Sequence, residues 1–234
     1  MYVDLLQCSF FNYKLPVELI AKFPTKNRSD SKLMYLNIHE DNLIHTKFWN
    51  LLSFINEKDL LIFNDSKVIA ARLFAKRNIT NAKVELLLER ILDNHHAISY
   101  LKHNAKLKIG DKLLIGNKYQ CEILAKNDKF YKLFFTDNIS HIISKVGVVP
   151  LPPYLKRNSQ EIDTLRYQTV YAKHDGSVAA PTAGLHFDNK LLKHINEKKI
   201  NTAFITLHVA GGTFLPVQEK NVLENKLHTE SFHV

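Results

Sequence analysis

Apolar and polar residues alternate in short runs through the middle of the chain, between residues 74 and 147. The runs cover residues 84–88, 97–101, 112–115, 119–124 and 129–135. Gly116-Asn117 separates two of them, which is the signature of a β-hairpin turn. Many short strands with little helix between them predict a small antiparallel β-barrel or sandwich.

The pattern on both sides of this region mixes strands with helices. Residues 59–63 predict a short apolar strand that ends at Asn64-Asp65, and residues 202–209 predict a β-branched strand that ends near Gly211-Gly212. Asp188 can cap a helix whose apolar residues recur at helical spacing, with Phe187 stapling its start. Pro16 opens a short helix through Ala21.

The two patterns together predict an α/β main domain built from both chain ends, with an inserted antiparallel β-barrel domain. The predicted α/β catalytic domain covers residues 1–73 and 148–234, and the β-barrel insert covers residues 74–147. Insertions of this kind are tolerated because chain ends often lie close together at the surface of a domain.

Composition excludes several classes of protein. Hydrophobic residues make up 45% of 234 residues, which is enough for a packed core. No apolar run reaches the roughly 18 residues of a membrane span, and the first 11 residues lack a signal peptide, so a cytoplasmic location is expected by default. Cys8 and Cys121 are too few for a disulfide framework or a zinc site.

The formal net charge of +9 would attract a polyanion such as RNA. An AT-rich genome would give the same abundance of lysine without selection for binding, so that explanation stays open. The insert at residues 74–147 holds 13 Lys and Arg against 7 Asp and Glu, whereas the remainder holds 19 against 16. The basic surplus therefore lies mostly in the predicted barrel.

Polar side chains gather where predicted strands end. Pro181, Thr182, Gly184 and His186 lie in a run of small residues just before the predicted helix, where backbone N–H groups can hold an anion. The alternative is a tight strand-to-helix turn with a surface histidine.

His208, Gly212 and Thr213 follow the second strand, and Asn64 and Asp65 follow the first. Ligands of α/β proteins bind at such strand ends. The alternatives are a core histidine and a generic Asn-Asp turn.

Arginine is rare in this chain, with 6 residues against 26 lysines, so each arginine is a candidate for a chosen contact. Arg72 and Arg166, with Gln168 nearby, are predicted to hold a carboxylate or phosphate. Three prolines in the segment 150–153 hold the backbone extended ahead of Arg166 and Gln168. The alternative role of this segment is a strap between the two domains.

His228 and Glu230 stand two residues apart near the chain end and could act as an acid–base pair from one face of a strand. The alternative is a chain end without a catalytic role. No dinucleotide fingerprint, P-loop, zinc-hydrolase motif or nucleophile elbow is present, so those functions and a metal site are not expected.

The order and length of several motifs resemble the S-adenosylmethionine:tRNA ribosyltransferase-isomerase (QueA) family of queuosine biosynthesis. The resemblance rests on residues 11–16, 59–65, 149–154, 166–171, 176–187, 206–209, 212–214 and 228–230. Lys32, Lys67 and Val148 depart from its usual residues, and Ala210-Gly211 reverses a usual pair. Family motifs that normally follow over roughly a hundred residues have no counterpart, so the α/β domain is expected to be incomplete at its C-terminus.

The resemblance implies an enzyme that transfers the ribosyl moiety of S-adenosylmethionine to the aminomethyl-deazaguanine at the wobble position of tRNA. Isomerisation then gives epoxyqueuosine and releases adenine and methionine. The implied partners are the precursor tRNA and S-adenosylmethionine as co-substrate, with no cofactor and a monomeric chain. His186, His208, His228 and Glu230 are the implied acid–base candidates, and the residues around 182–186 and 206–213 are expected to share one cavity.

Two other functions compete with this interpretation. A methyltransferase that uses S-adenosylmethionine would need a Gly-rich loop after its first strand, which is missing. An inactive or split-gene fragment of the family enzyme would act at most as a tRNA-binding module, with the basic insert as its platform.

Overall fold

The computed structural model describes residues 12–104, 106–217, 219–227 and 229–234. Six strands between residues 72 and 135 close into an antiparallel barrel in the order β10-β7-β6-β5-β8-β9. Their bounds are Arg72–Arg77 (β5), Lys83–Ile91 (β6), His96–His103 (β7), Lys112–Ile115 (β8), Tyr119–Asn127 (β9) and Phe130–Phe135 (β10).

Alternation along each strand explains why the barrel forms. Every second residue is buried, as in β6, where Val84, Leu86 and Leu88 point inward and are at most 2% exposed. The residues between them point outward and remain partly exposed. All five predicted strands of this region are confirmed, as is the Gly116-Asn117 hairpin turn between β8 and β9.

Helix α1 (Ile139–Val146) follows the last barrel strand and was not predicted. The side chain of Asn138 caps it by accepting from the N–H groups of Ser140 and His141. Ile139 and Ile142 are fully buried in the same core as the barrel interior. The sequence did not predict this helix, because it has only two turns and follows a series of residues with a strand pattern.

Parallel strand pairs form the second part of the molecule, as the α/β prediction requires. Strand β3 (Leu60–Asn64) pairs in parallel with β12 (Asn201–His208), and β4 (Ser66–Val68) pairs in parallel with β11 (His174–Ser177). The short strand β13 (Ser231–His233) adds an antiparallel edge to β12. The fold class is therefore α/β with an antiparallel barrel.

Helix α3 (Asn189–Glu197) forms where a helix was predicted, and it packs on the β3–β12 sheet. The Asp188 carboxylate accepts from the N–H of Leu191 at its start. Leu191 and Ile195 join Phe63 and Phe187 in one buried cluster, in which the two phenylalanine rings meet edge to face at 5.0 Å.

The remaining elements are short. They are β1 (Lys32–Asn37), β2 (Asn42–Lys47), α2 (Glu161–Arg166), α4 (Glu219–Leu223) and the 3-10 helices Val17–Leu19, Arg28–Asp30, Phe48–Ser53, Pro153–Leu155, Thr182–His186 and Gly211–Phe214. The helix predicted from Pro16 through Ala21 is wrong in extent, because only one 3-10 turn forms and Ile20 is already extended.

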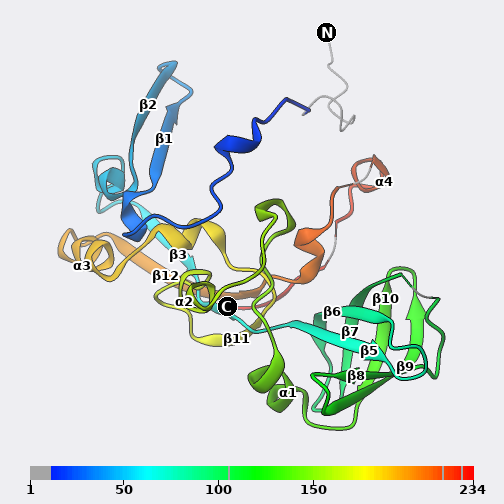
Figure 1. Cartoon of the computed structure of the whole chain (residues 1–234). Helices are drawn as coiled ribbons and strands as arrows, with labels where there is room; N and C mark the ends of the chain where they lie inside the picture. The colour runs from blue at the N-terminus through cyan, green and yellow to red at the C-terminus, as the bar shows by residue number, and fades with distance from the viewer. Residues whose placement is uncertain (1–11, 105, 218, 228) are drawn as a thin grey trace.

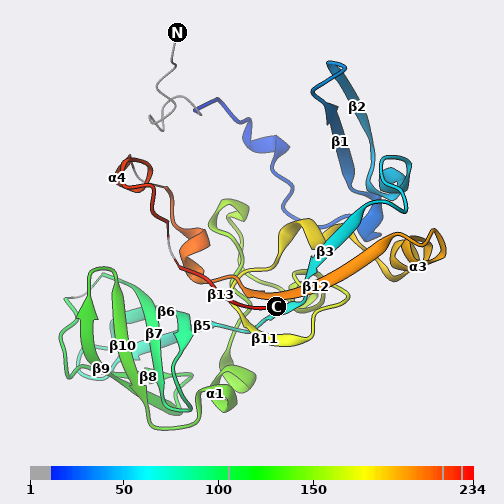
Figure 2. The same cartoon turned by 180° about the vertical axis from the view of Figure 1, so that it is seen from behind.

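Figures 1 and 2 show the barrel at one end of the molecule and the β1–β2 hairpin at the other, with β3 and β12 between them. The chain enters the barrel at Arg72 and leaves it at Val148, where the two backbones exchange hydrogen bonds of 3.1 and 2.9 Å. The first barrel strand thus begins two residues before the predicted insert boundary. No helix in the described ranges is long and apolar enough to cross a membrane.

Candidate active site

The C-terminal ends of β3 and β12 are joined by the side chain of Asn64. Its Nδ2 donates to the carbonyl of Leu207 at 2.9 Å, and its Oδ1 accepts from the N–H of Leu207 at 3.0 Å. The same oxygen accepts from the N–H of Ser66. Asn64 therefore fixes the backbone next to His208, and its amide is occupied by these bonds.

Asp65 lies at the centre of a polar cluster at the same strand ends. Its side chain is buried, and Oδ1 accepts a 2.6 Å hydrogen bond from the Thr206 hydroxyl. Oδ2 lies 3.6 Å from Nε2 of His174, the first residue of β11. The sequence interpretation missed His174, because nothing in the sequence shows that β11 runs alongside β4.

His208, the last residue of β12, is adjacent to this cluster. Its ring lies against Gly176, where an added Cβ would come within 2.7 Å of Nδ1. Burial lowers the pKa of His208, His233 and His174 lower it further, and Asp65 partly opposes them. Nδ1 is buried and has no hydrogen-bond partner among the described residues. A neutral imidazole in this position is suited to accept a proton.

His186 ends the 3-10 helix Thr182–His186, in different surroundings. Its ring lies 5.2 Å from the ring of Phe48, and burial together with the nearby Arg28 guanidinium lowers its pKa. Pro181 caps this 3-10 helix, Thr182 is exposed, and Gly184 is packed tightly beneath Tyr171. The geometry makes Gly184 necessary, because a side chain there would overlap the Tyr171 hydroxyl.

The rings of His186 and His208 have different neighbours among the described residues. His186 neighbours Phe48 and Arg28, whereas His208 neighbours His174, His233 and Gly176. The two segments are connected through the aromatic cluster, in which Phe187 contacts Phe63, and through hydrogen bonds from the N–H groups of Val178 and Ala179 to the Val209 carbonyl. The expected shared cavity of residues 182–186 and 206–213 therefore stays a prediction.

Gly212 and Glu230 lie around the turn that follows β12. The Glu230 carboxylate accepts from the N–H of Ala210 at 2.7 Å, and Glu89 of the barrel strand β6 accepts from the N–H of Gly212 at 3.4 Å. Thr213 is exposed on this turn. His228, the predicted partner of Glu230, lies outside the described residues.

The predicted arginine and glutamine ligands hold parts of the fold together. Arg166 donates to the carbonyls of Thr25 and Lys26, and Gln168 exchanges two hydrogen bonds with the backbone of Val68. Arg72 lies 3.1 Å from the Glu85 carboxylate. A structural role is thus established for each, and their contact with a substrate stays a prediction.

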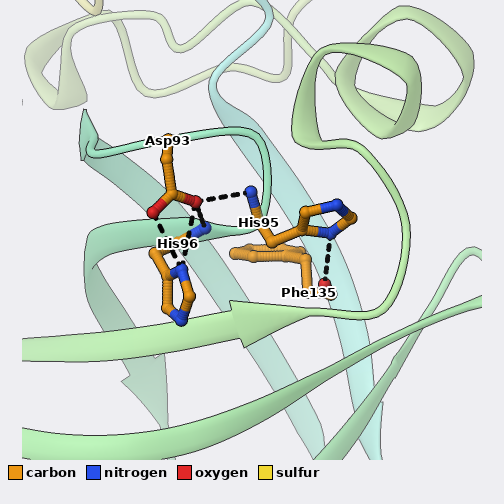
Figure 3. Close-up of polar contacts among 4 residues, drawn as sticks. All are labelled: Asp93, His95, His96 and Phe135. Atoms are coloured by element: carbon orange, nitrogen blue, oxygen red, sulfur yellow. Dashed lines mark hydrogen bonds and ion pairs between the residues drawn. The ribbon is translucent and has the colours of Figure 1, made fainter.

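Two further histidines lie at the turn between β6 and β7, where Figure 3 shows their contacts. Asp93 accepts from the N–H groups of His95 and His96 at 2.8 Å each, and its carboxylate lies 3.0 Å from Nδ1 of His96. These bonds, the His95 N–H first, hold the pKa of Asp93 below its usual value. Nδ1 of His95 lies 3.0 Å from the Phe135 carbonyl. These side chains stabilise a turn, and no group of described residues is arranged to hold a metal ion.

Comparison with known proteins identifies the family. A family model described as "Queuosine biosynthesis protein" matches residues 8–234. S-adenosylmethionine:tRNA ribosyltransferase-isomerases of two Legionella pneumophila strains, Lens and Paris, are 43% and 42% identical over 224 residues. Each match covers 96% of this chain and 66% of the relative, so the chain spans just under two thirds of their length.

A crystal structure of S-adenosylmethionine tRNA ribosyltransferase from Thermotoga maritima is 27% identical, with a TM-score of 0.35. The match covers 85% of this chain and 58% of that one. The family model covers nearly the whole chain and the Legionella relatives are the more similar sequences. The chain therefore belongs to the queuosine biosynthesis protein family.

Proposed function

We propose that this chain acts as an S-adenosylmethionine:tRNA ribosyltransferase-isomerase. The observation that carries the proposal is the 43% identity to a relative of that name along 96% of the chain. In the proposed reaction the ribosyl moiety of S-adenosylmethionine moves to the aminomethyl-deazaguanine at the tRNA wobble position. The product is epoxyqueuosine in tRNA, and adenine and methionine are released.

We assign the first proton transfer to His208. The positive sulfonium of S-adenosylmethionine acidifies the neighbouring ribose methylene, so the reaction needs a base that is neutral near pH 7. The lowered pKa of His208 and its place at the ends of two parallel strands meet this need. Asn64 is a positioning residue, because it fixes the strand end through Leu207.

Asp65 supplies the negative charge of the same cluster. Its carboxylate is held by Thr206 and faces His174, so it can receive the ribose hydroxyls or the methionine ammonium. His186 is the second candidate base, because burial lowers its pKa as well. Thr182 and Thr213 are exposed, so their hydroxyls are accessible to a bound substrate.

The test is turnover by the purified chain with S-adenosylmethionine and precursor tRNA, with adenine release measured by chromatography. His208→Gln should reduce the rate by roughly 10²- to 10⁴-fold. His45→Gln, in the exposed hairpin strand β2, is the matched control and should change nothing. His186→Gln in the same assay decides between the two candidate bases.

Three outcomes bear on the proposal. Near-normal turnover by His208→Gln would remove His208 from the mechanism. Release of no adenine by the unchanged chain would contradict the enzymatic proposal. If that chain still bound precursor tRNA, the tRNA-binding module would be the remaining function.

A further inference from the structure

A cavity of about 480 Å³ lies on the outer face of the barrel, apart from the histidine site. The barrel face forms its floor, and its walls come from the proline-rich strap at residues 151–158 and from the turn at residues 211–215. Apart from Arg72, Gly212 and Thr213 in or beside its lining, none of the predicted site residues belongs to this region.

Strand register arranges the floor. Phe130 of β10 lies opposite Tyr100 of β7, Tyr100 lies opposite Leu87 of β6, and Leu87 lies opposite Arg72 of β5. Residues directly opposite on neighbouring strands project from the same face, so these four side chains form one row across four strands. All four line the cavity. The row offers two adjacent aromatic rings at one end and a guanidinium at the other.

Two lysines are among the residues that line the cavity. Lys102 follows Tyr100 by two residues on the same face of β7, and Lys156 of the strap lies across from the barrel. Neither ammonium has a hydrogen bond or ion pair within the described part of the chain. Arg157, by contrast, is neutralised by Asp163 at 2.6 Å.

A second cavity of about 550 Å³ adjoins the first, since both are lined by Glu85 and Lys102. It continues along the barrel past Phe74, Lys76 and Lys83. Phe74 lines this second cavity and is 55% exposed, so its ring is accessible from solvent. The two cavities thus form one groove that is lined by aromatic side chains and lysines.

We infer that this groove binds unpaired nucleotides of RNA, with one base inserted between the Tyr100–Phe130 pair and the strap. Aromatic side chains bind single-stranded nucleic acid by stacking on bases, while cations follow the backbone. The Glu89 carboxylate lines the cavity and would repel a phosphate there, whereas the Glu85 carboxylate is ion-paired with Arg72. The base therefore enters, and its phosphates stay near Lys102 and Lys156.

The inference rests on the proposed function in that it takes the RNA to be the unpaired loop of the substrate tRNA. The probe is a fluorescent anticodon stem-loop RNA, compared with a fully paired duplex of the same length. Tyr100→Leu with Phe130→Leu removes both rings but keeps apolar bulk on the barrel face. Phe134→Leu, an outward residue of the same strand β10 that does not line the groove, is the matched control.

The expected result is a loss of stem-loop affinity of at least about fivefold in the double variant, with duplex binding unchanged. The Phe134 variant should bind as the unchanged chain does. Lys102→Gln, an exposed position whose replacement leaves the core intact, should lower the salt dependence of stem-loop binding by about one unit. This variant keeps the inference testable if the double variant does not fold.

Unchanged stem-loop affinity in the folded double variant would overturn the inference and leave the proposed enzymatic function standing. Loss of S-adenosylmethionine binding with RNA binding retained would also overturn it, since the groove would then hold the donor. Aromatic-dependent RNA binding by a chain that releases no adenine would support the inference and contradict the enzyme. No RNA binding by the unchanged chain would remove both.

Discussion

The protonation of His208 is decided by the residues around it. Its pKa lies below the ordinary value of 6.5, because burial and the neighbours His233 and His174 disfavour the charged ring, while Asp65 favours it. His174→Gln should therefore raise the pKa of His208, and Asp65→Asn should lower it. The measurement is an NMR titration of the His208 ring. If both variants moved the pKa in one direction, the electrostatic account of the site would be wrong.

The lowered pKa of His208 also predicts how turnover depends on pH. A base must be deprotonated to act, so kcat/KM should fall as pH drops through the lowered pKa of His208. The midpoint of this acid limb should lie below 6.5 and should rise in His174→Gln. A midpoint that stayed fixed in His174→Gln would assign the limb to another group.

Gly176 controls the position of the same ring. Its φ is +149°, a value that side chains disfavour, and an added Cβ would meet the His208 ring at 2.7 Å. Gly176→Ala should therefore lower the free energy of unfolding by about 1–3 kcal/mol and displace the ring. Gly110→Ala is the control, with φ at +86° and nothing within 4 Å of the added Cβ, so it should show the backbone cost alone. Equal losses measured by urea denaturation would contradict the steric account.

At the scale of elements, the strap is fastened by one buried ion pair. Arg157 donates two hydrogen bonds to Asp163 at 2.6 and 2.8 Å, and these side chains are only 12% and 4% exposed. Arg157→Leu leaves a buried carboxylate unpaired and should lower the free energy of unfolding by about 3–5 kcal/mol. Arg157→Lys keeps the charge without the planar fork and should cost less.

The sign of the pH dependence follows from Asp163, whose pKa is lowered chiefly by its hydrogen bonds to Arg157. A carboxyl group with a lowered pKa in the folded state stabilises the fold above its unfolded value, near 3.8, and loses that effect as pH falls. The difference in unfolding free energy between the unchanged chain and Arg157→Leu should narrow in acid. Urea denaturation at several pH values measures it, and a constant difference would exclude the ion pair as its source.

The elements were predictable where one pattern decides the structure. The short apolar runs of β6 and β7 predict strands from local sequence alone, and Asp188 marks the start of α3 by a local cap. Helix α1 is also capped locally by Asn138, but its two turns lie among strand signals. His174 and the row from Phe130 to Arg72 were not predictable, because both depend on which strands become neighbours.

At the scale of the whole molecule, the excess of lysine and arginine in the barrel region predicts where precursor tRNA binds. Lys76 and Lys83 lie on the barrel groove, whereas Lys58 and Lys190 are exposed lysines of the α/β part. Changing either pair to glutamate alters the net charge equally. Only the barrel pair should weaken precursor tRNA binding, with a reduction of the salt slope of about two units. Equal effects of the two pairs would show that net charge alone attracts the RNA.

The bridge between Arg72 and Val148 has a consequence for how the two parts can be separated. The backbones that enter and leave the barrel are hydrogen-bonded to each other. They are therefore as close together as the two strands of a β-hairpin. Replacing the 75 residues between them by a tight turn would span the same gap with little loop-closure penalty. The ends of the excised barrel, next to Arg72 and Val148, would be close enough to be joined by a peptide bond into a cyclic protein.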